Sequence, residues 1–196
     1  MDYRAAKQFI LAKLRDELSD QLSYHGIHHT MDVLKMAAEI CESEGVDGHN
    51  LILVKTAALF HDAGFVKNKH VGHETEGCLM VQEFLPKFNY STSDIDTICG
   101  MIMATKIPQS PSNLLEEILC DADLDYLGRD DFFNIGNSLF VELQAYHLLN
   151  DTQAWNRLQV SFLSAHKFYT DTNRTLREPV KLRYLEDLKE LVATYA

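Results

Sequence analysis

The sequence has no apolar stretch that approaches the roughly 18 residues of a membrane-spanning helix. Charged residues are spread through its first twenty positions, which therefore lack the apolar core of a secretory signal. Cysteine is scarce, and no two of the four cysteines have the Cys-x-x-Cys spacing of zinc or redox sites. Isolated cysteines are typical of small buried residues in a reducing compartment. We therefore expect a cytoplasmic protein without a membrane partner.

Basic residues are few relative to acidic ones. The chain has 18 Lys and Arg against 29 Asp and Glu, which gives a formal net charge of −11. Proteins that bind nucleic-acid polymers usually carry a basic stripe that neutralises phosphates, so such a polymer is not the expected partner. A small phosphorylated substrate remains possible, because a metal ion can supply positive charge locally.

Signals for β-structure are also lacking. We find no alternating apolar and polar segment, no hairpin signal and no internal repeat. Apolar residues instead recur at helical spacing, as in Phe9, Ile10, Leu14 and Leu18. A chain of 196 residues with 46% apolar content is long enough to bury a core. The prediction is an all-α, multi-helix bundle with one domain over residues 1–196.

Helix boundaries follow from caps, glycines and prolines. Asp2 is the expected cap of the first helix, and residues 19–28 are expected to form a loop that delivers His29 to the start of the second helix. Ser93 and Asp96 have the spacing of a capping box for the fifth. Pro179 suits the first turn of the last helix. The expected helices are residues 3–18, 30–44, 49–60, 74–85, 93–105, 114–119, 132–149, 155–169 and 179–195.

An apolar helical run, residues 57–65, ends in His61 and Asp62 and breaks at Gly64. Neighbouring residues inside a helix project about 100° apart, so the pair can share a target only where the backbone relaxes at the last turn. Imidazole and carboxylate together suit a divalent ion. A purely structural alternative exists, because a histidine complements the helix dipole and an aspartate accepts hydrogen bonds from loop amides.

Two further motifs flank this pair. Residues 24–33 place His29 before a threonine that opens a helix, and residues 120–128 read Cys-Asp-Ala-Asp-Leu-Asp-Tyr-Leu-Gly. In order, spacing and flanking residues, the three motifs resemble those of the HD-domain superfamily of metal-dependent phosphohydrolases. The resemblance covers roughly residues 22–132, and the helices in residues 132–196 are expected to complete the bundle.

The resemblance implies that His29, His61, Asp62 and Asp123 bind one divalent metal ion: Mn, Fe, Ni, Co, Mg or Zn. The family pattern makes Asp123 the ligand, and Asp121 a supporting or capping residue, although the sequence alone does not exclude the reverse. Open positions on the ion would take water and a phosphate oxygen. The implied function is hydrolysis of a phosphoester, of a nucleotide or another small phosphorylated metabolite, with His61 and Asp62 at the catalytic centre.

Other residues are candidates for contacts with the substrate. His73, which opens a helix, is either a phosphate contact or proton donor or a plain helix-start residue. Its presence resembles the two-metal branch of the superfamily, but residues 101–106 lack the further histidines of that branch, which favours one metal. The remaining candidates for substrate binding are His25, Lys67, Lys69, Thr105, Lys106 and Arg129.

Two other functions stay open at this point. The chain can be a non-catalytic module that senses nucleotides or regulates a partner, since domains similar to this one also have regulatory roles. A di-iron oxygenase on the same fold is the other alternative, and it would need additional histidines. The apolar C-terminal helices also allow a homodimer.

Overall fold

The computed structural model describes residues 1–67 and 71–195. Within these ranges it contains ten α-helices, three short 3-10 helices and no strand, which confirms the all-α prediction. The α-helices are α1 (Tyr3–Glu17), α2 (Ile27–Ser43), α3 (Gly48–Phe60), α4 (His73–Phe84), α5 (Thr92–Ala104), α6 (Leu114–Asp123), α7 (Phe132–Ala145), α8 (Thr152–Ala165), α9 (Asp171–Leu176) and α10 (Glu178–Ala193). The 3-10 helices are Ala63–Lys67, Leu85–Phe88 and Asp125–Gly128.

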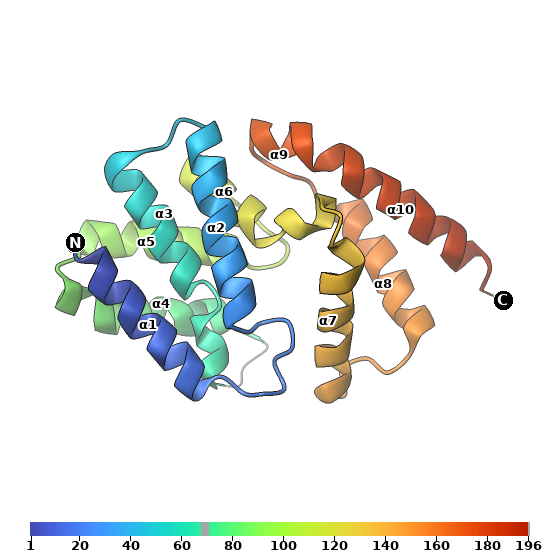
Figure 1. The fold of residues 1–196 in the computed structure, drawn as a ribbon, viewed down its shortest axis with the longest axis horizontal. Helices are drawn as coiled ribbons and strands as arrows, with labels where there is room; N and C mark the ends of the chain where they lie inside the picture. The colour runs from blue at the N-terminus through green and yellow to red at the C-terminus, as the bar shows by residue number, and fades with distance from the viewer. Residues whose placement is uncertain (68–70, 196) are drawn as a thin grey trace.

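The helices form two groups, which Figure 1 shows at the left and right of the molecule. Helices α1 to α6 surround a large apolar core, to which α3 contributes buried residues on most of its circumference. Helices α7, α8 and α10 surround a smaller core that also contains Tyr24 and Phe168. The segment from α6 through Asp125–Gly128 connects the groups, so the motif residues lie near their boundary.

Several local predictions are confirmed. The Asp2 carboxylate accepts a hydrogen bond from the Ala5 N–H at 3.0 Å and caps α1. Pro179 lies in the first turn of α10, where its missing N–H costs no helical hydrogen bond. The second helix, however, begins at Ile27 and not at Thr30, because the Gly26 carbonyl already accepts from the Thr30 N–H. His29 is therefore part of the first turn of α2 and does not precede the helix.

The capping box of α5 was predicted at the wrong serine. Ser91 is the cap: its hydroxyl accepts from the Asp94 N–H at 3.2 Å, and the Asp94 carboxylate accepts from the Ser91 N–H at 2.8 Å. Both Ser91 and Ser93 precede an aspartate by three positions, so the local sequence fits either choice. The sequence also gave no signal for α9, a six-residue helix that the Thr170 side chain caps.

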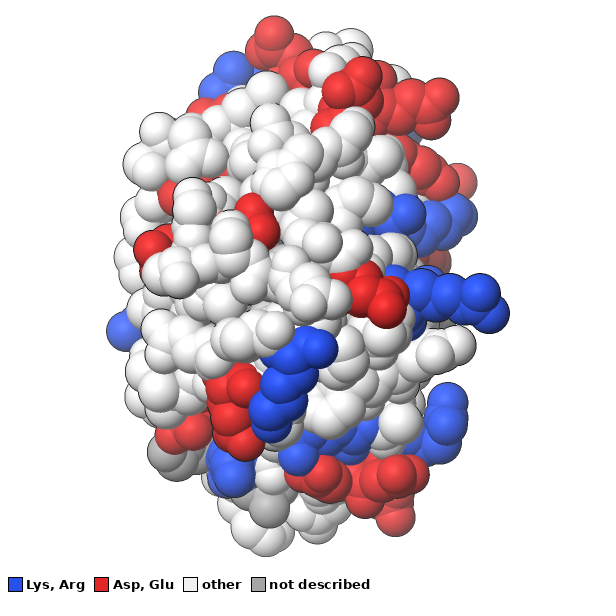
Figure 2. Space-filling view, turned by 90° about the vertical axis from the view of Figure 1, so that its left-hand side faces the viewer, with Lys and Arg blue, Asp and Glu red and all other residues white. Residues whose placement is uncertain are grey.

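No helix in the described part of the chain combines the length and low polarity needed to cross a bilayer. Figure 2 shows the side of the molecule formed by the N-terminal group of helices, where charged side chains of both signs lie mainly toward the edges and uncharged ones cover the middle.

Candidate metal centre

The candidate centre begins at the end of α3, where His61 follows Phe60 and is completely buried. Its Nδ1 lies 2.9 Å from the carbonyl oxygen of Ala58, one turn earlier in the helix. A carbonyl can only accept a hydrogen bond, so Nδ1 carries a proton and Nε2 is the nitrogen that can bind an ion once it is deprotonated. The helix thereby orients the ring and selects its tautomer, as commonly occurs for metal-binding histidines.

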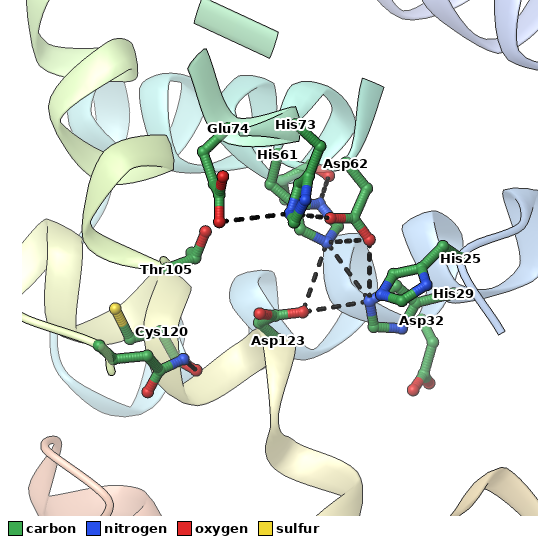
Figure 3. Close-up of polar contacts among 12 residues, drawn as sticks. His25, His29, Asp32, His61, Asp62, His73, Glu74, Thr105, Cys120 and Asp123 are labelled. Atoms are coloured by element: carbon green, nitrogen blue, oxygen red, sulfur yellow. Dashed lines mark hydrogen bonds and ion pairs between the residues drawn. The ribbon is translucent and has the colours of Figure 1, made fainter. Parts of the chain in front are cut away.

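Four side chains from three helical segments meet at this Nε2 atom (Figure 3). His61 Nε2 lies 3.1 Å from Asp62 Oδ2 and 3.4 Å from Asp123 Oδ1. His29 Nε2 lies 3.1 Å from Asp123 Oδ1 and 3.4 Å from Asp62 Oδ2. The two Nε2 atoms are 3.3 Å apart. The four predicted metal ligands thus point toward one another, although 94 positions separate His29 from Asp123.

The chemistry of this cluster fits a cation. His61 Nε2 faces oxygens of two carboxylates, and Asp62 Oδ2 is buried without a hydrogen-bond partner. Buried polar atoms that lack partners are costly, and a positive ion among them offsets that cost. Donor atoms of His29, His61 and Asp123 lie within 4.8 Å of one another. The cluster is therefore a possible site for a divalent metal ion.

Electrostatics keep both carboxyl groups ionised. Burial alone would raise the pKa of Asp62, but His61 outweighs it and holds that pKa well below its usual range. For Asp123, hydrogen bonds to His29 and His61 likewise outweigh burial and lower the pKa. Burial lowers the pKa of His61, whereas the two carboxylates together raise it well above the usual value. A metal ion must therefore compete with a proton for this ring.

Asp121 and Asp123 have different surroundings. Asp121 is completely buried and accepts hydrogen bonds from the backbone N–H groups of Tyr169 and Thr170 and from the Thr170 hydroxyl, at 2.7 to 3.1 Å. Burial raises its pKa to about 6. Asp121 therefore anchors the segment before α9, whereas Asp123 faces the histidines.

The start of α4 lies beside the cluster because Gly64 lets the two backbones meet. A Cβ at Gly64 would lie 2.0 Å from the carbonyl oxygen of His73. His73 Nε2 is consequently 3.5 Å from both Asp62 Oδ1 and Glu74 Oε1. Glu74 is buried, and its Oε2 atom has no hydrogen-bond partner. We did not predict Glu74 as a site residue, because an acid in a first helical turn already has a structural explanation.

A stack of three rings separates His73 from the loop before α2. The ring of Phe65 lies between His25, at 4.1 Å, and His73, at 4.3 Å between centroids. The buried Glu142 of α7 accepts from the backbone N–H of His25 at 3.0 Å and contacts its Nδ1 atom. Burial lowers the pKa of His25, but the hydrogen bond to Glu142 and nearby carboxylates raise it above the usual value. The sequence offers no signal for this distant pairing.

A cavity of about 260 Å³ opens from the cluster toward α7 and α8. Its polar end is formed by His25, Asp62, His73, Glu74, Thr105 and Asp123. The far end is lined mainly by aliphatic and aromatic side chains of α7 and α8. The cavity therefore joins a possible reaction centre to an apolar chamber.

The remaining predicted substrate contacts are distributed unevenly. Thr105 is buried at the polar end of the cavity, whereas Lys67 and Lys106 are exposed and do not line it. Arg129 borders a second, smaller cavity behind His29. Its guanidinium pairs with three carboxylates, those of Asp32, Asp125 and Asp131. Lys69 lies outside the described residues, so its prediction has no structural counterpart.

Comparisons with known proteins show the family of the chain and its fold. The sequence model of a family described as HD domain matches residues 26–125. Three solved structures are similar, each with a TM-score of 0.63. A predicted HD superfamily hydrolase from an uncultured Thermotogales bacterium is 23% identical, and the match covers 96% of this chain and 92% of that one. Bacillus subtilis YpgQ in complex with ADP is 22% identical, with 98% of each chain covered.

The third structure is a protein from Lactobacillus plantarum that is 18% identical, with 98% of this chain and 97% of that one covered. At these identities the likeness establishes a shared fold. No curated protein matches the chain.

Proposed function

Because the chain belongs to the HD domain family, we propose that it is a metal-dependent phosphohydrolase that acts on a nucleotide or another small phosphorylated metabolite. One observation carries this proposal: two imidazole nitrogens and two carboxylate oxygens converge within 3.1 to 3.4 Å at the end of a cavity. The structure of YpgQ with ADP supports a nucleotide as one substrate class.

We assign one divalent ion to His29, His61, Asp62 and Asp123. Such an ion would supply positive charge for a phosphate oxygen and would lower the pKa of a bound water toward neutral pH. The protein side chains around it have their own tasks. His73 and Glu74 border both the cluster and the cavity and are placed to exchange a proton with the reacting ester. His25, at the same end, contacts the phosphate.

Elemental analysis of the purified protein, followed by a phosphate-release screen over nucleotides and other phosphate esters, tests the proposal. The decisive pair of variants is Asp123→Asn and Asp121→Asn, because both remove a carboxylate from the same turn of α6. We expect Asp123→Asn to lose the bound metal and to lower turnover at least about a thousandfold, since the ion supplies most of the charge stabilisation. Asp121→Asn should retain the metal.

Three results would contradict the proposal. They are phosphate release unaffected by Asp123→Asn, equal metal content in the two variants, and tight nucleotide binding without hydrolysis across a panel of divalent metals. The last result would favour a non-catalytic sensor.

A further inference from the structure

We propose that the substrate carries a large apolar organic group, which occupies the far end of the cavity between α7 and α8. The inference rests on the proposed function, because it takes the His/Asp cluster as the place where the phosphate reacts. The substrate class that fits is a phosphomonoester of an alkyl, polyisoprenyl or aromatic alcohol. Of the two substrate classes in the proposed function, this selects the phosphorylated metabolite that is not a nucleotide, because a nucleoside polyphosphate carries further charge.

The far end is built from two apolar helix faces. On α7, Phe132, Gly136 and Leu139 recur at helical spacing and line the cavity, and on α8 Trp155 and Phe162 do the same. Apolar faces of neighbouring helices ordinarily bury one another. These two faces border an open chamber instead. An apolar ligand in the chamber would bury the apolar surface that the two helices leave uncovered.

The chamber offers little to a charged or strongly polar guest. Among the described residues that line the cavity there is no lysine or arginine, and its charged groups at the polar end include three carboxylates. Away from the cluster the lining offers few polar groups: the hydroxyls of Tyr24 and Tyr126, the indole N–H of Trp155, and Gln159, whose amide already donates to Asn156 at 3.2 Å. A second phosphate or a sugar placed there would lose more hydrogen bonds to water than these few groups could replace. Charge and hydrogen bonding therefore both favour an apolar group.

Gly136 adds space at the centre of this chamber. Glycine inside a helix lowers the stability of the helix relative to alanine, so its presence in α7 needs an explanation. A Cβ at this position would lie 3.5 Å from Gln159 Oε1 and 3.8 Å from Trp155 Cζ2, which is ordinary contact. Packing therefore does not require the glycine. Its missing side chain instead leaves room between the two helices.

The rim of the cavity is also apolar. Ile107 and Leu158 both line it and are 53% and 47% exposed. Apolar side chains exposed at a cavity mouth indicate binding of an apolar partner more often than isolated surface residues do. A chain that enters the chamber would cover them.

Trp155 is the only tryptophan of the chain and lines the far end, so its fluorescence reports occupancy without catalysis. The metal-loaded protein is titrated with n-alkylphosphonates from ethyl to octyl, which resist hydrolysis. We expect affinity to rise roughly fourfold per added methylene, from the free energy of burying that group, until the chamber is full. Octylphosphonate should bind more tightly than ADP or ATP.

The matched variants are Gly136→Leu, which fills the chamber, and Asn137→Leu, which adds the same side chain at an exposed position of the same helix. Gly136→Leu should weaken octylphosphonate at least tenfold and leave ethylphosphonate unchanged, and Asn137→Leu should change neither. If Gly136→Leu does not fold, Gly136→Ala gives a smaller effect in the same direction, because its Cβ fits.

The two proposals fail in different ways. Affinity that does not depend on chain length, or nucleotides that bind more tightly than octylphosphonate, would overturn the apolar substrate even if phosphate is released from a nucleotide. A chain-length series that behaves as expected would support the apolar chamber even if no ester is hydrolysed, and the proposed function would then be the part that fails.

Discussion

The carboxylate of Glu142 holds the ring of His25, which lies 117 positions earlier in the chain, with Oε1 2.5 Å from Nδ1. Its other oxygen accepts from the backbone N–H groups of Tyr24 and His25, at 2.8 and 3.0 Å. One buried side chain of α7 therefore fixes both the backbone and the ring of the loop that precedes α2. It also connects the helices that wall the apolar chamber with the polar end of the cavity.

The first prediction concerns this pair. Glu142→Gln preserves size and one acceptor oxygen but removes the charge, so the raised pKa of His25 should fall and less of the ring should be protonated at neutral pH. We expect kcat/KM at pH 7 to fall roughly tenfold to a hundredfold, with the alkaline limb of the pH profile moved to lower pH. The measurement is the full pH profile. The exposed Glu186→Gln on α10 is the control, and an unchanged profile in Glu142→Gln would refute the role of His25.

The second prediction concerns stability in the presence of metal. An ion that binds only the folded chain raises the free energy of unfolding by about 2.7 kcal/mol at a hundred times its Kd. For a chain of this length the melting temperature should rise by roughly 5–10 °C when the cognate metal is added and return with a chelator. Asp123→Asn should abolish the shift, whereas Asp121→Asn should retain it from a lower starting stability. A shift of equal size in Asp123→Asn would show that the ion binds elsewhere.

The third prediction compares two glycines. Gly64→Ala places a methyl group 2.0 Å from the backbone carbonyl oxygen of His73, so α4 must move away from the 3-10 helix Ala63–Lys67. We expect a loss of about 3 kcal/mol or more in urea denaturation, with a loss of activity as His73 separates from Asp62. Gly100→Ala in α5 meets only the flexible end of Glu116, at 3.2 Å, and should be neutral or stabilising by up to about 1 kcal/mol. Equal effects of the two changes would contradict this account.

The fourth prediction is a pH dependence of stability. His166 is packed against Phe168, and burial, followed by the nearby Lys181, lowers its pKa to about 3. Below pH 6.5 the unfolded chain binds a proton at this histidine and the folded chain does not, so stability falls as pH decreases toward 3. Between pH 6.5 and 5 this amounts to at most about 2 kcal/mol.

Asp121 acts in the opposite direction. Its folded pKa of about 6 lies above the unfolded value, so the folded chain gains stability from protonation as pH falls from 6 toward 4. Urea denaturation at several pH values separates the two groups. His166→Gln should make stability less sensitive to acid than in the wild type, and Asp121→Asn should make it more sensitive. The same pH dependence in all three proteins would contradict both assignments.

The fold class and the convergence of the motif residues could be predicted because short sequence patterns indicate both. Helical periodicity marks the elements, and His61 and Asp62 occur in a distinctive helix end. The structure brings the four predicted ligands together, and their binding of a metal stays a prediction. Details that depend on tertiary contacts were not accessible. Glu142 lies in an ordinary amphipathic helix, and only the folded chain places it beside His25.

The charged candidates illustrate the same limit. A lysine or arginine near a motif attracts phosphate only if its charge is free and faces the cavity. Arg129 instead pairs with Asp131, which is close in sequence, and with Asp32, which is 97 positions away. Lys106 is exposed and does not line the cavity. The sequence does not predict the apolar chamber, because the apolar faces of α7 and α8 have the same pattern as helices that pack in a core.

Asp121 and Asp123 leave one turn of α6 in different directions, toward the backbone at Tyr169 and Thr170 and toward the histidines. The end of α6 therefore does two things: Asp121 binds the backbone that leads into α9 and α10, and Asp123 contributes a carboxylate to the candidate centre. In the proposed enzyme, the packing of the C-terminal helices and the position of a metal-binding carboxylate would therefore depend on two residues two positions apart.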